Sequence, residues 1–380
     1  MRMKTCASAF SLLGAAALLA ACSSTDSSDS SGGGASGTDS VVSFDIAKGQ
    51  PIPNQSLSSW CGDKKVKVGL AVGEGTNSWV ETLRYQFTKT AKQCNSVDAD
   101  ILYTSGGGDQ QKAISQINSQ VAQGVNVLLV QPDFGAAELP AIRSAKKAGV
   151  TVVVYNSAIG GKPGTDFTAQ TILDGHAAGK ALGTKLGENV KKGNVVYLGG
   201  IPGAASSKDS FDGVKDALTG FPDLKLVTDT PVTTNWTAAG AQQAMAGLIA
   251  KYPSIDAVVT DYGVTARGAM AAFQLAGKPI PAIATESTDN QFGCEWHKLA
   301  DKSINVPVFS IDGATSMAEI ALRQGVAAAT GNKYSADQKF AAPLFNDTPA
   351  GHEPPCDPNL PPDADLSAGL STAELATLFK

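Results

Sequence analysis

The stretch "GLAVGEGTNSWVE", residues 69–81, indicates the fold of the chain. A hydrophobic run over 66–72 ends in a turn that contains Gly73 and Gly75, and an amphipathic pattern follows over 80–93. A strand, a glycine-rich turn and a helix in this order are typical of a parallel α/β sheet. Because oxidoreductases hold a dinucleotide at the same kind of turn, the stretch raises the question of what this turn binds.

Two features argue against a dinucleotide. Ser78 takes the third small position of the fingerprint, and the bulky Trp79 follows where a cofactor helix packs closely on its strand. The next strand ends in "ILYTSGGGD", so that Asp109 lies beyond a triple-glycine turn and no acid is in place for a ribose. The cofactor hypothesis is therefore weak.

The sequence also lacks the motifs of the common hydrolases and metal sites. It has no Gly-x-Ser-x-Gly elbow, no His-Glu-x-x-His pair and no Cys-x-x-Cys pair. The three histidines, His176, His297 and His352, are scattered along the chain. We therefore expect a protein that is not an enzyme and that needs neither a metal nor a cofactor.

Length and composition indicate two packed lobes and exclude nucleic acid as a partner. The chain has 380 residues, of which 43% are hydrophobic, and its formal net charge is -5. This length is more typical of two lobes than of one core. A mildly acidic surface does not attract nucleic acid.

The first residues resemble a bacterial export signal with a lipid attachment site. Residues 1–22, "MRMKTCASAFSLLGAAALLAAC", have a basic start, a short apolar run and small residues before Cys22. We expect residues 1–21 to be a signal peptide and Cys22 to carry the lipid, although an ordinary secretory signal is the alternative. Residues 22–60 begin with a Ser- and Gly-rich segment and are expected to form a flexible tether.

Four cysteines remain for disulfides once Cys6 and Cys22 are set aside. An exported chain meets an oxidising compartment, and Cys61, Cys94, Cys294 and Cys356 allow three pairings. We favour Cys61 with Cys94, because a βα unit returns the chain to the same end of the sheet. The second pair, Cys294 with Cys356, would then hold the C-terminal tail.

Short β-branched runs alternate with amphipathic segments from residue 65 onward, which predicts parallel strands joined by crossover helices. The strands are expected in two series, over 66–72, 100–103, 125–130 and 151–155, and over 194–198, 225–228, 257–260 and 281–284. The helices are expected over 80–93, 110–122, 136–148, 175–188, 211–219, 238–251 and 264–276. Glycine and proline interrupt the pattern over 156–167, so two similar lobes are expected.

The ends of these strands carry aromatic, amide and charged side chains. In open α/β sheets ligands bind at the carboxyl ends of the strands, and two facing lobes make those ends into a cleft. The candidates there are Asn77, Trp79, Gly108, Asp109, Asn156, Ser157, Lys208, Trp236, Tyr262 and Glu286. Aromatic faces beside hydrogen-bonding groups suit a polyol, whose C–H groups pack on the ring while its hydroxyls donate and accept.

At this point the chain resembles the type I periplasmic binding proteins, in particular the sugar receptors of ABC importers related to the ribose-binding protein. The resemblance covers about residues 65 to 345 and is carried by "GDQQKAISQINSQVAQGVNVLLVQP", "AGVTVVVYN" and "KYPSIDAVVTDYGVTARGAMAAFQLAGKPIP". It implies two Rossmann-like lobes with parallel sheets, joined by a hinge of several strands. The expected lobes are 65–169 with 310–330, and 170–309 with 331–346. Residues 347–380 are expected to form a proline-rich tail with a short C-terminal helix.

The resemblance also implies ligand contacts at matching positions. Asn77, Trp79 and Trp236 match the pattern, and Ser310 falls at the crossover between the lobes. Several positions depart from it: Asn156 replaces an aspartate, Lys208 an arginine and Tyr262 an asparagine, and Glu286 or Ser287 falls where an aspartate is usual. These changes remove a bidentate clamp and imply a different polyol or a larger ligand. Two alternatives stay open, that Trp236 is a hydrophobic staple and that Lys208 is a solvated charge.

We therefore expect a monomeric, lipid-anchored receptor that closes its lobes on a sugar or polyol and delivers it to an ABC permease at the outer face of the cytoplasmic membrane. A sensor that presents its closed form to a chemoreceptor or kinase is the alternative. A nucleoside, a furanosyl signal or an amino acid is the alternative ligand. For an amino acid, Lys208 and Glu286 offer the paired charges that its zwitterion needs. The export signal excludes a DNA-binding repressor.

Overall fold

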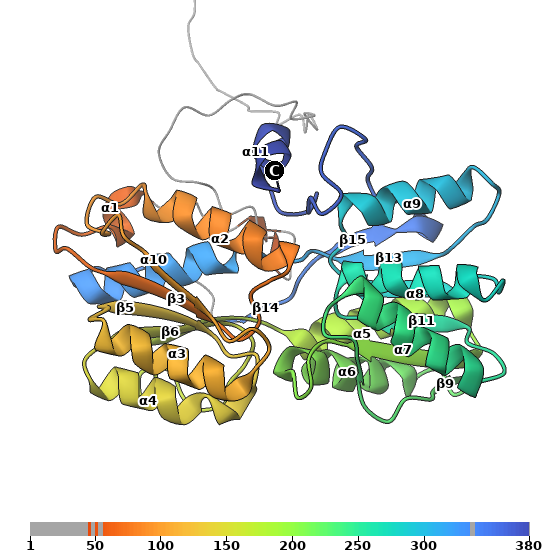
Figure 1. Cartoon of the computed structure of the whole chain (residues 1–380), viewed down its shortest axis with the longest axis horizontal. Helices are drawn as coiled ribbons and strands as arrows, with labels where there is room; N and C mark the ends of the chain where they lie inside the picture. The colour runs from red at the N-terminus through yellow and green to blue at the C-terminus, as the bar shows by residue number, and fades with distance from the viewer. Residues whose placement is uncertain (1–44, 47–49, 52–55, 335–338, 380) are drawn as a thin grey trace, which may run out of the picture. The chain divides into compact units, whose positions relative to one another are not determined.

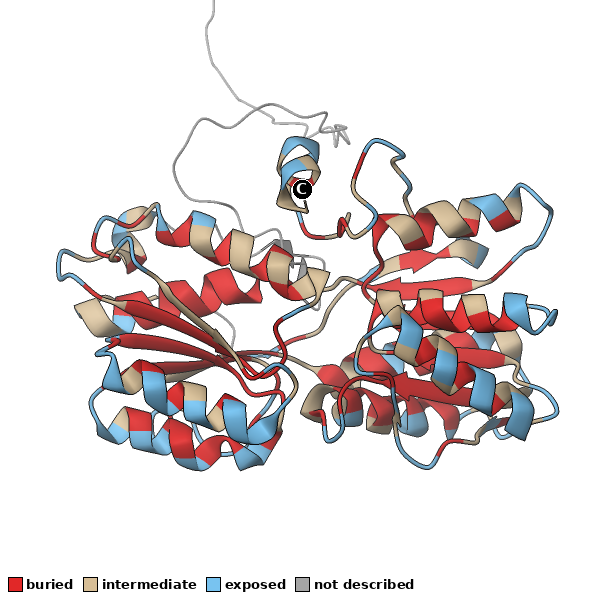
Figure 2. Ribbon diagram, in the orientation of Figure 1, coloured by how far each residue is buried: buried red, intermediate tan, exposed pale blue. Residues whose placement is uncertain are grey.

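The computed structural model describes residues 45–46, 50–51, 56–334 and 339–379. In this part of the chain, two β-sheets with helices on both faces form two lobes (Figure 1). The central strands are buried, whereas the outer faces of the helices are exposed (Figure 2). The expected α/β class with two Rossmann-like lobes is confirmed.

The first lobe is built on a six-stranded parallel sheet with the strand order β14-β7-β6-β5-β3-β4. Its strands are β3 (Val68–Val72), β4 (Leu102–Ser105), β5 (Val127–Gln131), β6 (Thr151–Asn156), β7 (Ala169–Leu173) and β14 (Lys339–Phe340). The strands β3 and β5 are buried along their whole length, as expected for a sheet that is covered on both faces.

Helices from distant parts of the sequence cover this sheet. They are α1 (Leu57–Trp60), α2 (Ser78–Ala91), α3 (Gln110–Ala122), the 3₁₀ helix η1 (Gly135–Ala137), α4 (Leu139–Lys147) and α10 (Met317–Thr330). Figure 1 shows α2 and α10 on one face and α3 and α4 on the other, and each face has its own apolar core. The late helix α10 thus completes the first lobe.

The second lobe has a seven-stranded sheet with the order β10-β8-β11-β12-β13-β15, in which β9 also pairs with β8. Its strands are β8 (Gly193–Gly199), β9 (Leu224–Leu226), β10 (Val232–Thr233), β11 (Ala257–Thr260), β12 (Ala282–Glu286), β13 (Val308–Ile311) and β15 (Leu344–Asp347). All pairs are parallel except β13 with β15. The helices are α5 (Gly175–Val190), α6 (Ala205–Leu218), α7 (Ala238–Lys251), α8 (Gly263–Leu275) and α9 (Asn290–Ala300).

The chain crosses between the sheets at three places, after β7, after β13 and after β14. The sheet pairing corrects the expected lobe boundaries. The strand β7 pairs with β6, and β14 pairs with β7, so both belong to the first sheet and not to the second. Ser310 and Ile311 belong to β13 in the second sheet, because this strand continues its parallel pairing with β12 to the level of Glu286.

The expected tether of residues 22–60 ends earlier than predicted. The short strands β1 (Asp45–Ile46) and β2 (Gln50–Pro51) pair antiparallel, and α1 packs on the first lobe. Trp60, the last residue of α1, is fully buried in the core of that lobe. An indole buried in this way fixes residues 57–60 to the lobe. Cys22 and the expected signal peptide lie outside the described residues.

Both favoured disulfides are present. Cys61, directly after α1, is bonded to Cys94, which follows α2. Cys294 on α9 is bonded to Cys356 in the C-terminal tail. The first bond ties the start of the lobe to its first helix, and the second fixes the tail to the second lobe.

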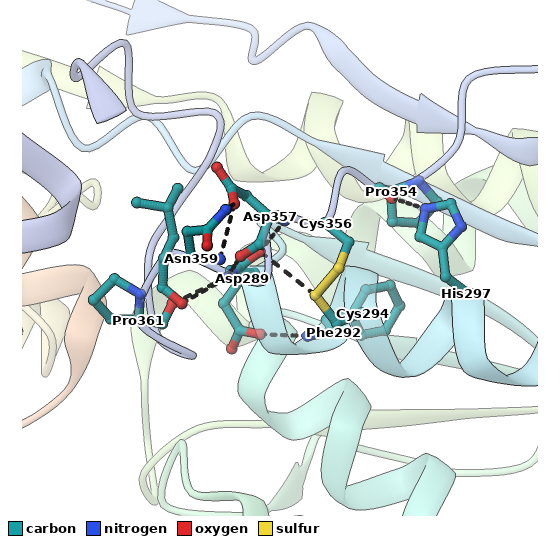
Figure 3. Close-up of a disulfide and its surroundings, with 11 residues drawn as sticks. Asp289, Phe292, Cys294, His297, Pro354, Cys356, Asp357, Asn359 and Pro361 are labelled. Atoms are coloured by element: carbon teal, nitrogen blue, oxygen red, sulfur yellow. Dashed lines mark hydrogen bonds between the residues drawn. A yellow bond between two sulfur atoms is a disulfide. The ribbon is translucent and has the colours of Figure 1, made fainter. Parts of the chain in front are cut away.

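The tail contains the 3₁₀ helix η2 (Thr348–Ala350) and the expected C-terminal helix, α11 (Thr372–Leu378), which Ser371 caps at its N-terminus. Around the Cys294–Cys356 bond the tail runs close to α9, where His297 contacts the carbonyl oxygen of Pro354 (Figure 3). The Asn290 side chain donates to the carbonyl oxygen of Asp357 at 2.8 Å. The tail is therefore packed against the lobe rather than free, although its first residue, Asp347, belongs to β15.

Candidate ligand cavity

A cavity of about 260 Å³ lies between the two lobes and is lined by residues of both. It sits where the carboxyl ends of the parallel strands of the two sheets face each other. Asn156 is the last residue of β6 and Glu286 the last of β12, and Tyr262 follows β11 closely. This is the position at which α/β sheets bind ligands.

Most of the residues expected at the site line this cavity. From the first lobe come Asn77, Trp79, Asn156 and Ser157, and from the second come Lys208, Trp236, Tyr262, Glu286 and its neighbour Ser287. Whether each of them contacts a ligand remains a prediction.

Gly108, Asp109 and Ser310 do not line the cavity, and each has another role. The Asp109 side chain caps α3 by accepting from the backbone N–H of Lys112 at 2.7 Å. Gly108 has a left-handed backbone with φ of 80°, and its N–H donates to the carbonyl oxygen of Gly73 at 3.0 Å. The fully buried Ser310 donates to Asn346 Oδ1 at 2.7 Å inside the second lobe. We therefore withdraw these three residues from the expected site.

Several acids and an amide at strand ends also line the cavity, although they were not expected there. Gln131 ends β5 and Asp133 follows it, whereas Asp261 follows β11 and Asp312 follows β13. Glu74 lies in the turn after β3. Asn156 and Glu286 were expected at the site because they lie at the carboxyl ends of strands. The acids in "VQPD" and "VVTD" lie at strand ends too, so the sequence could have identified them.

The indole of Trp79 is held in a fixed orientation at the wall of the cavity. Its Nε1 donates to the carbonyl oxygen of Gly313 at 2.6 Å, in the segment that crosses between the lobes after β13. Asn77 is also engaged, since its Oδ1 caps α2 at Val80 N and its Nδ2 donates to Glu74 at 2.8 Å. A ring that is held in place loses little further freedom when a ligand packs on it.

Trp236 lines the cavity in a strained backbone conformation. Its φ is 51°, in the left-handed region, and that of Asn235 is 56°. The indole packs directly on Gly200, where an added Cβ would lie 1.9 Å from Cε2, so only glycine fits there. Asn156 and Ser287 also line the cavity with positive φ values of 65° and 49°. Strain of this kind gathers at functional sites.

Tyr262 connects the two lobes at the edge of the cavity. Its hydroxyl lies 2.7 Å from Ser78 Oγ and accepts from the backbone N–H of Trp79 at 3.4 Å, and both residues belong to the first lobe. A second link runs from the backbone N–H of Ala205 to the carbonyl oxygen of Asp133 at 2.9 Å. Burial of the Tyr262 side chain raises the pKa of its hydroxyl, so it stays protonated and able to donate. The lobes are thus in contact around the cavity.

Four cavity acids have raised pKa values because they are buried. Burial raises the pKa of Asp133 and of Asp261 to about 6. Burial and the negative charge of Asp261 raise the pKa of Glu286 to about 8. Burial and the charge of Asp365 raise that of Asp312 to about 7. At neutral pH Glu286 and Asp312 therefore retain protons and can both donate and accept hydrogen bonds, whereas Asp133 and Asp261 are mainly ionised and accept them.

Lys208 lies at the exposed rim and pairs with Asp212, one helical turn further along α6. The exposed fractions of these side chains are 71% and 45%, so the pair is largely solvated. This geometry favours the alternative that Lys208 is a solvated charge. It also weakens the amino-acid hypothesis, because the ammonium is directed to Asp212.

Two negative findings concern the described residues. No group of three or more His, Cys, Asp or Glu side chains there is placed to hold a metal ion. Within the same ranges, none of the helices has the length and apolar character needed to cross a membrane.

Comparisons with known proteins give the same assignment at the level of family. A family model described as "Periplasmic binding protein domain" matches residues 68–333. The ribose import binding protein of Bacillus subtilis (strain 168) is 28% identical over 61% of this chain and 73% of its own length. The D-xylose-binding periplasmic protein of Escherichia coli (strain K12) is 28% identical over 56% of this chain but only 64%, less than two thirds, of its own length.

The fold is shared with solved structures. The crystal structure of an ABC transporter solute binding protein from Thermobispora bispora matches with a TM-score of 0.62 and 26% identity, over 75% of this chain and 86% of that chain. The family model spans more than half of the chain and contains most of the cavity-lining residues. The chain therefore belongs to the periplasmic binding protein domain family, whose members bind solutes and are not enzymes.

Proposed function

We propose that the chain captures a sugar or sugar-like polyol in the cavity between its lobes and delivers it to the permease of an ABC importer. The observation that carries the proposal is the lining of the cavity. Two indoles and a phenol, from Trp79, Trp236 and Tyr262, stand beside amides and carboxyls that both donate and accept. Polyols need this combination of apolar faces and in-plane hydrogen-bonding groups.

The size of the cavity favours a small ligand. At about 260 Å³ it lies just below the usual range for ligand pockets, which is about 300–1,000 Å³. This volume supports a ligand of monosaccharide size rather than the larger ligand that the departures from the family pattern allowed. The relatives named for ribose and D-xylose bind sugars of this size class.

The location follows from the N-terminal sequence. Periplasmic binding proteins of import systems are exported, and residues 1–21 have the features of an export signal. We propose that Cys22 carries the lipid and that the Ser- and Gly-rich residues after it tether the lobes to the membrane. Intact-mass analysis of the membrane fraction tests this: a mature chain that starts at Cys22 with added acyl mass supports the anchor, and an unmodified Cys22 contradicts it.

The ligand proposal is tested by screening the purified protein. Native mass spectrometry reports a ligand retained from the host, and thermal-shift measurements compare neutral pentoses, hexoses, sugar alcohols and nucleosides. We expect at least one neutral sugar or sugar alcohol to raise the unfolding temperature. If nucleosides alone stabilise the protein, the transport role stands but the sugar proposal fails. If nothing in the screen binds, the proposal fails outright.

A further inference from the structure

The charge of the cavity points to a more specific ligand than a neutral sugar. Seven carboxylic acids line it, against one amine, that of Lys208, which is already paired with Asp212 at the rim. None of the ion pairs formed among the described residues involves Asp133, Asp261, Glu286 or Asp312. Asp133 and Asp261, whose pKa values of about 6 leave them mainly ionised at pH 7, therefore give the buried part of the cavity negative charge that the described protein side chains do not balance.

Asp261 and Glu286 stand next to each other in this part. The strands β11 and β12 run parallel with Thr260 opposite Thr285. Asp261 directly follows β11, and Glu286 is the last residue of β12. Neighbouring strands are about 4.8 Å apart, and the two carboxyls are close enough that, in addition to burial, the charge of Asp261 raises the pKa of Glu286. Asp261 Oδ1 and Glu286 Oε1 are both buried, and no hydrogen bond to either atom has ordinary geometry, although the Trp236 side chain lies near Asp261 and the Ser210 hydroxyl near Glu286.

Two further polar atoms without partners lie on the wall from the first lobe. Gln131 and Ser157 are each only 4% exposed, and both line the cavity. Gln131 Oε1 and Ser157 Oγ form no hydrogen bond. Buried polar groups are nearly always satisfied, so unpaired acceptors on both walls indicate that a hydrogen-bond donor belongs between them.

The charge distinguishes the kinds of donor. A ligand hydroxyl satisfies a hydrogen bond but leaves the negative charge of ionised Asp261 unbalanced. A protonated amine provides the hydrogen bonds, balances that charge and favours ionisation of the neighbouring Glu286. The faces of Trp79, Trp236 and Tyr262 also attract a cation. We propose that the ligand is a monosaccharide-sized polyol with a protonated amine, and that Asp261 and Glu286 bind the ammonium. This inference rests on the proposed function.

Paired sugars test this inference by isothermal titration calorimetry. D-Glucosamine, D-galactosamine and D-mannosamine are compared with D-glucose, D-galactose and D-mannose at pH 7. We expect at least one amino sugar to bind about tenfold or more tightly than its neutral partner. In Asp261→Asn and Glu286→Gln this preference should shrink or vanish, while Asp216→Asn, on the exposed face of α6 beside His176, should keep it.

The results of this calorimetry distinguish a failure of the amino-sugar inference from a failure of the proposed transport function. Neutral sugars that bind as tightly as their amino partners overturn the inference and leave the proposed function intact. A preference for the amino sugar that persists in both variants also overturns it, because Asp261 and Glu286 would then not be the ammonium site. No binding by any sugar, neutral or amino, overturns both.

A second inference concerns the C-terminal tail, which lies beyond the family match and contacts both lobes. It is fixed to the second lobe by the Cys294–Cys356 bond and by an ion pair between Arg267 and Asp363 at 3.3 Å. Its last part reaches the first lobe, where α11 packs beside α2. Lys89 pairs with Glu374 at 2.7 Å, and Gln86 Nε2 donates to the carbonyl oxygen of Ala368 at 2.6 Å.

The tail also touches the segment that crosses between the lobes behind the cavity. The backbone N–H of Gly313 donates to Ser367 Oγ at 3.4 Å. Burial and, in addition, the charge of Asp365 raise the pKa of Asp312. Opening the lobes requires the tail to leave one of its two anchors. We infer that residues 357–379 act as a strap that holds the lobes together around the cavity.

The strap is tested without a ligand by measuring the distance between the lobes. Spin labels at Ala99→Cys and Lys278→Cys, on exposed positions of the first and second lobe, report this distance by double electron–electron resonance. We expect removal of residues 369–380, which deletes α11, to lengthen or broaden the distance distribution. Arg143→Gln, which breaks an ion pair within the first lobe, is the control. An unchanged distribution after the deletion overturns the strap, provided that circular dichroism shows a folded chain.

Discussion

At the scale of single residues, the indoles of Trp79 and Trp236 are the main apolar surfaces of the cavity. We expect Trp79→Ala and Trp236→Ala each to weaken binding of the sugar that gives the largest thermal shift by at least about 1 kcal/mol, because each removes a stacking face. Calorimetry measures the loss. Trp296→Phe is the matched control, since that indole donates to Val306 in the second lobe and does not line the cavity. Unchanged affinity in both cavity variants would remove these residues from the site.

The buried acids predict a pH dependence of stability for the unliganded protein. The pKa values of Asp261, Asp312 and Glu286 are about 6, 7 and 8 in the folded state, above the values of about 4 in an unfolded chain. The folded state therefore binds more protons, and its stability is full below about pH 4 and falls as the pH rises toward 8. Glu374 has the opposite shift, to about 2, and affects stability only under acidic conditions.

Thermal unfolding at pH 5.5 and pH 8.0 checks this dependence. We expect a higher unfolding temperature at pH 5.5 and a smaller difference in Glu286→Gln, which has no charge to bury. Glu81→Gln, on the exposed face of α2, should keep the full difference. A protein that is more stable at pH 8.0 would contradict the burial of these acids.

The sequence predicted the aromatic residues of the cavity better than its acids. Trp79 and Trp236 are large and few, so they stand out beside a strand end. Asp133 and Asp261 look like ordinary solvated charges in sequence, whereas in the structure each accepts hydrogen bonds inside its own lobe at the wall of the cavity. Asp109 was expected to contact the ligand but caps α3 instead, because a position after a glycine turn suits a helix cap as well as a ligand contact.

At the scale of elements, the Cys61–Cys94 bond fixes α1 to the end of α2. It closes a loop of 33 residues, and native disulfides of this kind contribute about 2–4 kcal/mol to the free energy of unfolding. We expect the double variant Cys61→Ser and Cys94→Ser to lose stability of this order in urea denaturation while keeping the cavity. Loss of ligand binding in a variant that still folds would mean that the bond also shapes the site.

The long buried strands and the amphipathic helices could be predicted from periodicity, whereas the short connecting elements could not. The runs at β3, β5 and β11 are apolar, contain two valines each and are bounded by turns. The strand β14 has two residues, and β7 follows a glycine-rich loop, so neither has a pattern of its own. Their pairing depends on the neighbouring strand, which is why the lobe boundaries were misplaced.

At the scale of the whole molecule, Tyr262 joins the lobes through its hydroxyl. Tyr262→Phe keeps the ring in the cavity but removes the contact with Ser78, which forms only when the lobes meet. We expect about a two- to tenfold loss of affinity, mainly through faster ligand dissociation, since one hydrogen bond contributes about 0.5–1.5 kcal/mol.

Tyr252→Phe is the matched control for this change. Its hydroxyl donates to Val227 within the second lobe, so its loss affects stability but not closure. Stopped-flow fluorescence with the sugar that gives the largest thermal shift compares the two variants. Equal dissociation rates in Tyr262→Phe and in the unmodified protein would show that this contact does not hold the lobes together.

The central claim is that a polyol binds between the lobes, in contact with both. A crystal structure of the protein with the sugar or amino sugar that gives the largest thermal shift tests it most directly. We expect the ring against Trp79 and Trp236, and its polar groups within hydrogen-bonding distance of Asp261 and Glu286. A ligand bound outside this cavity, or one that touches a single lobe, would contradict the claim.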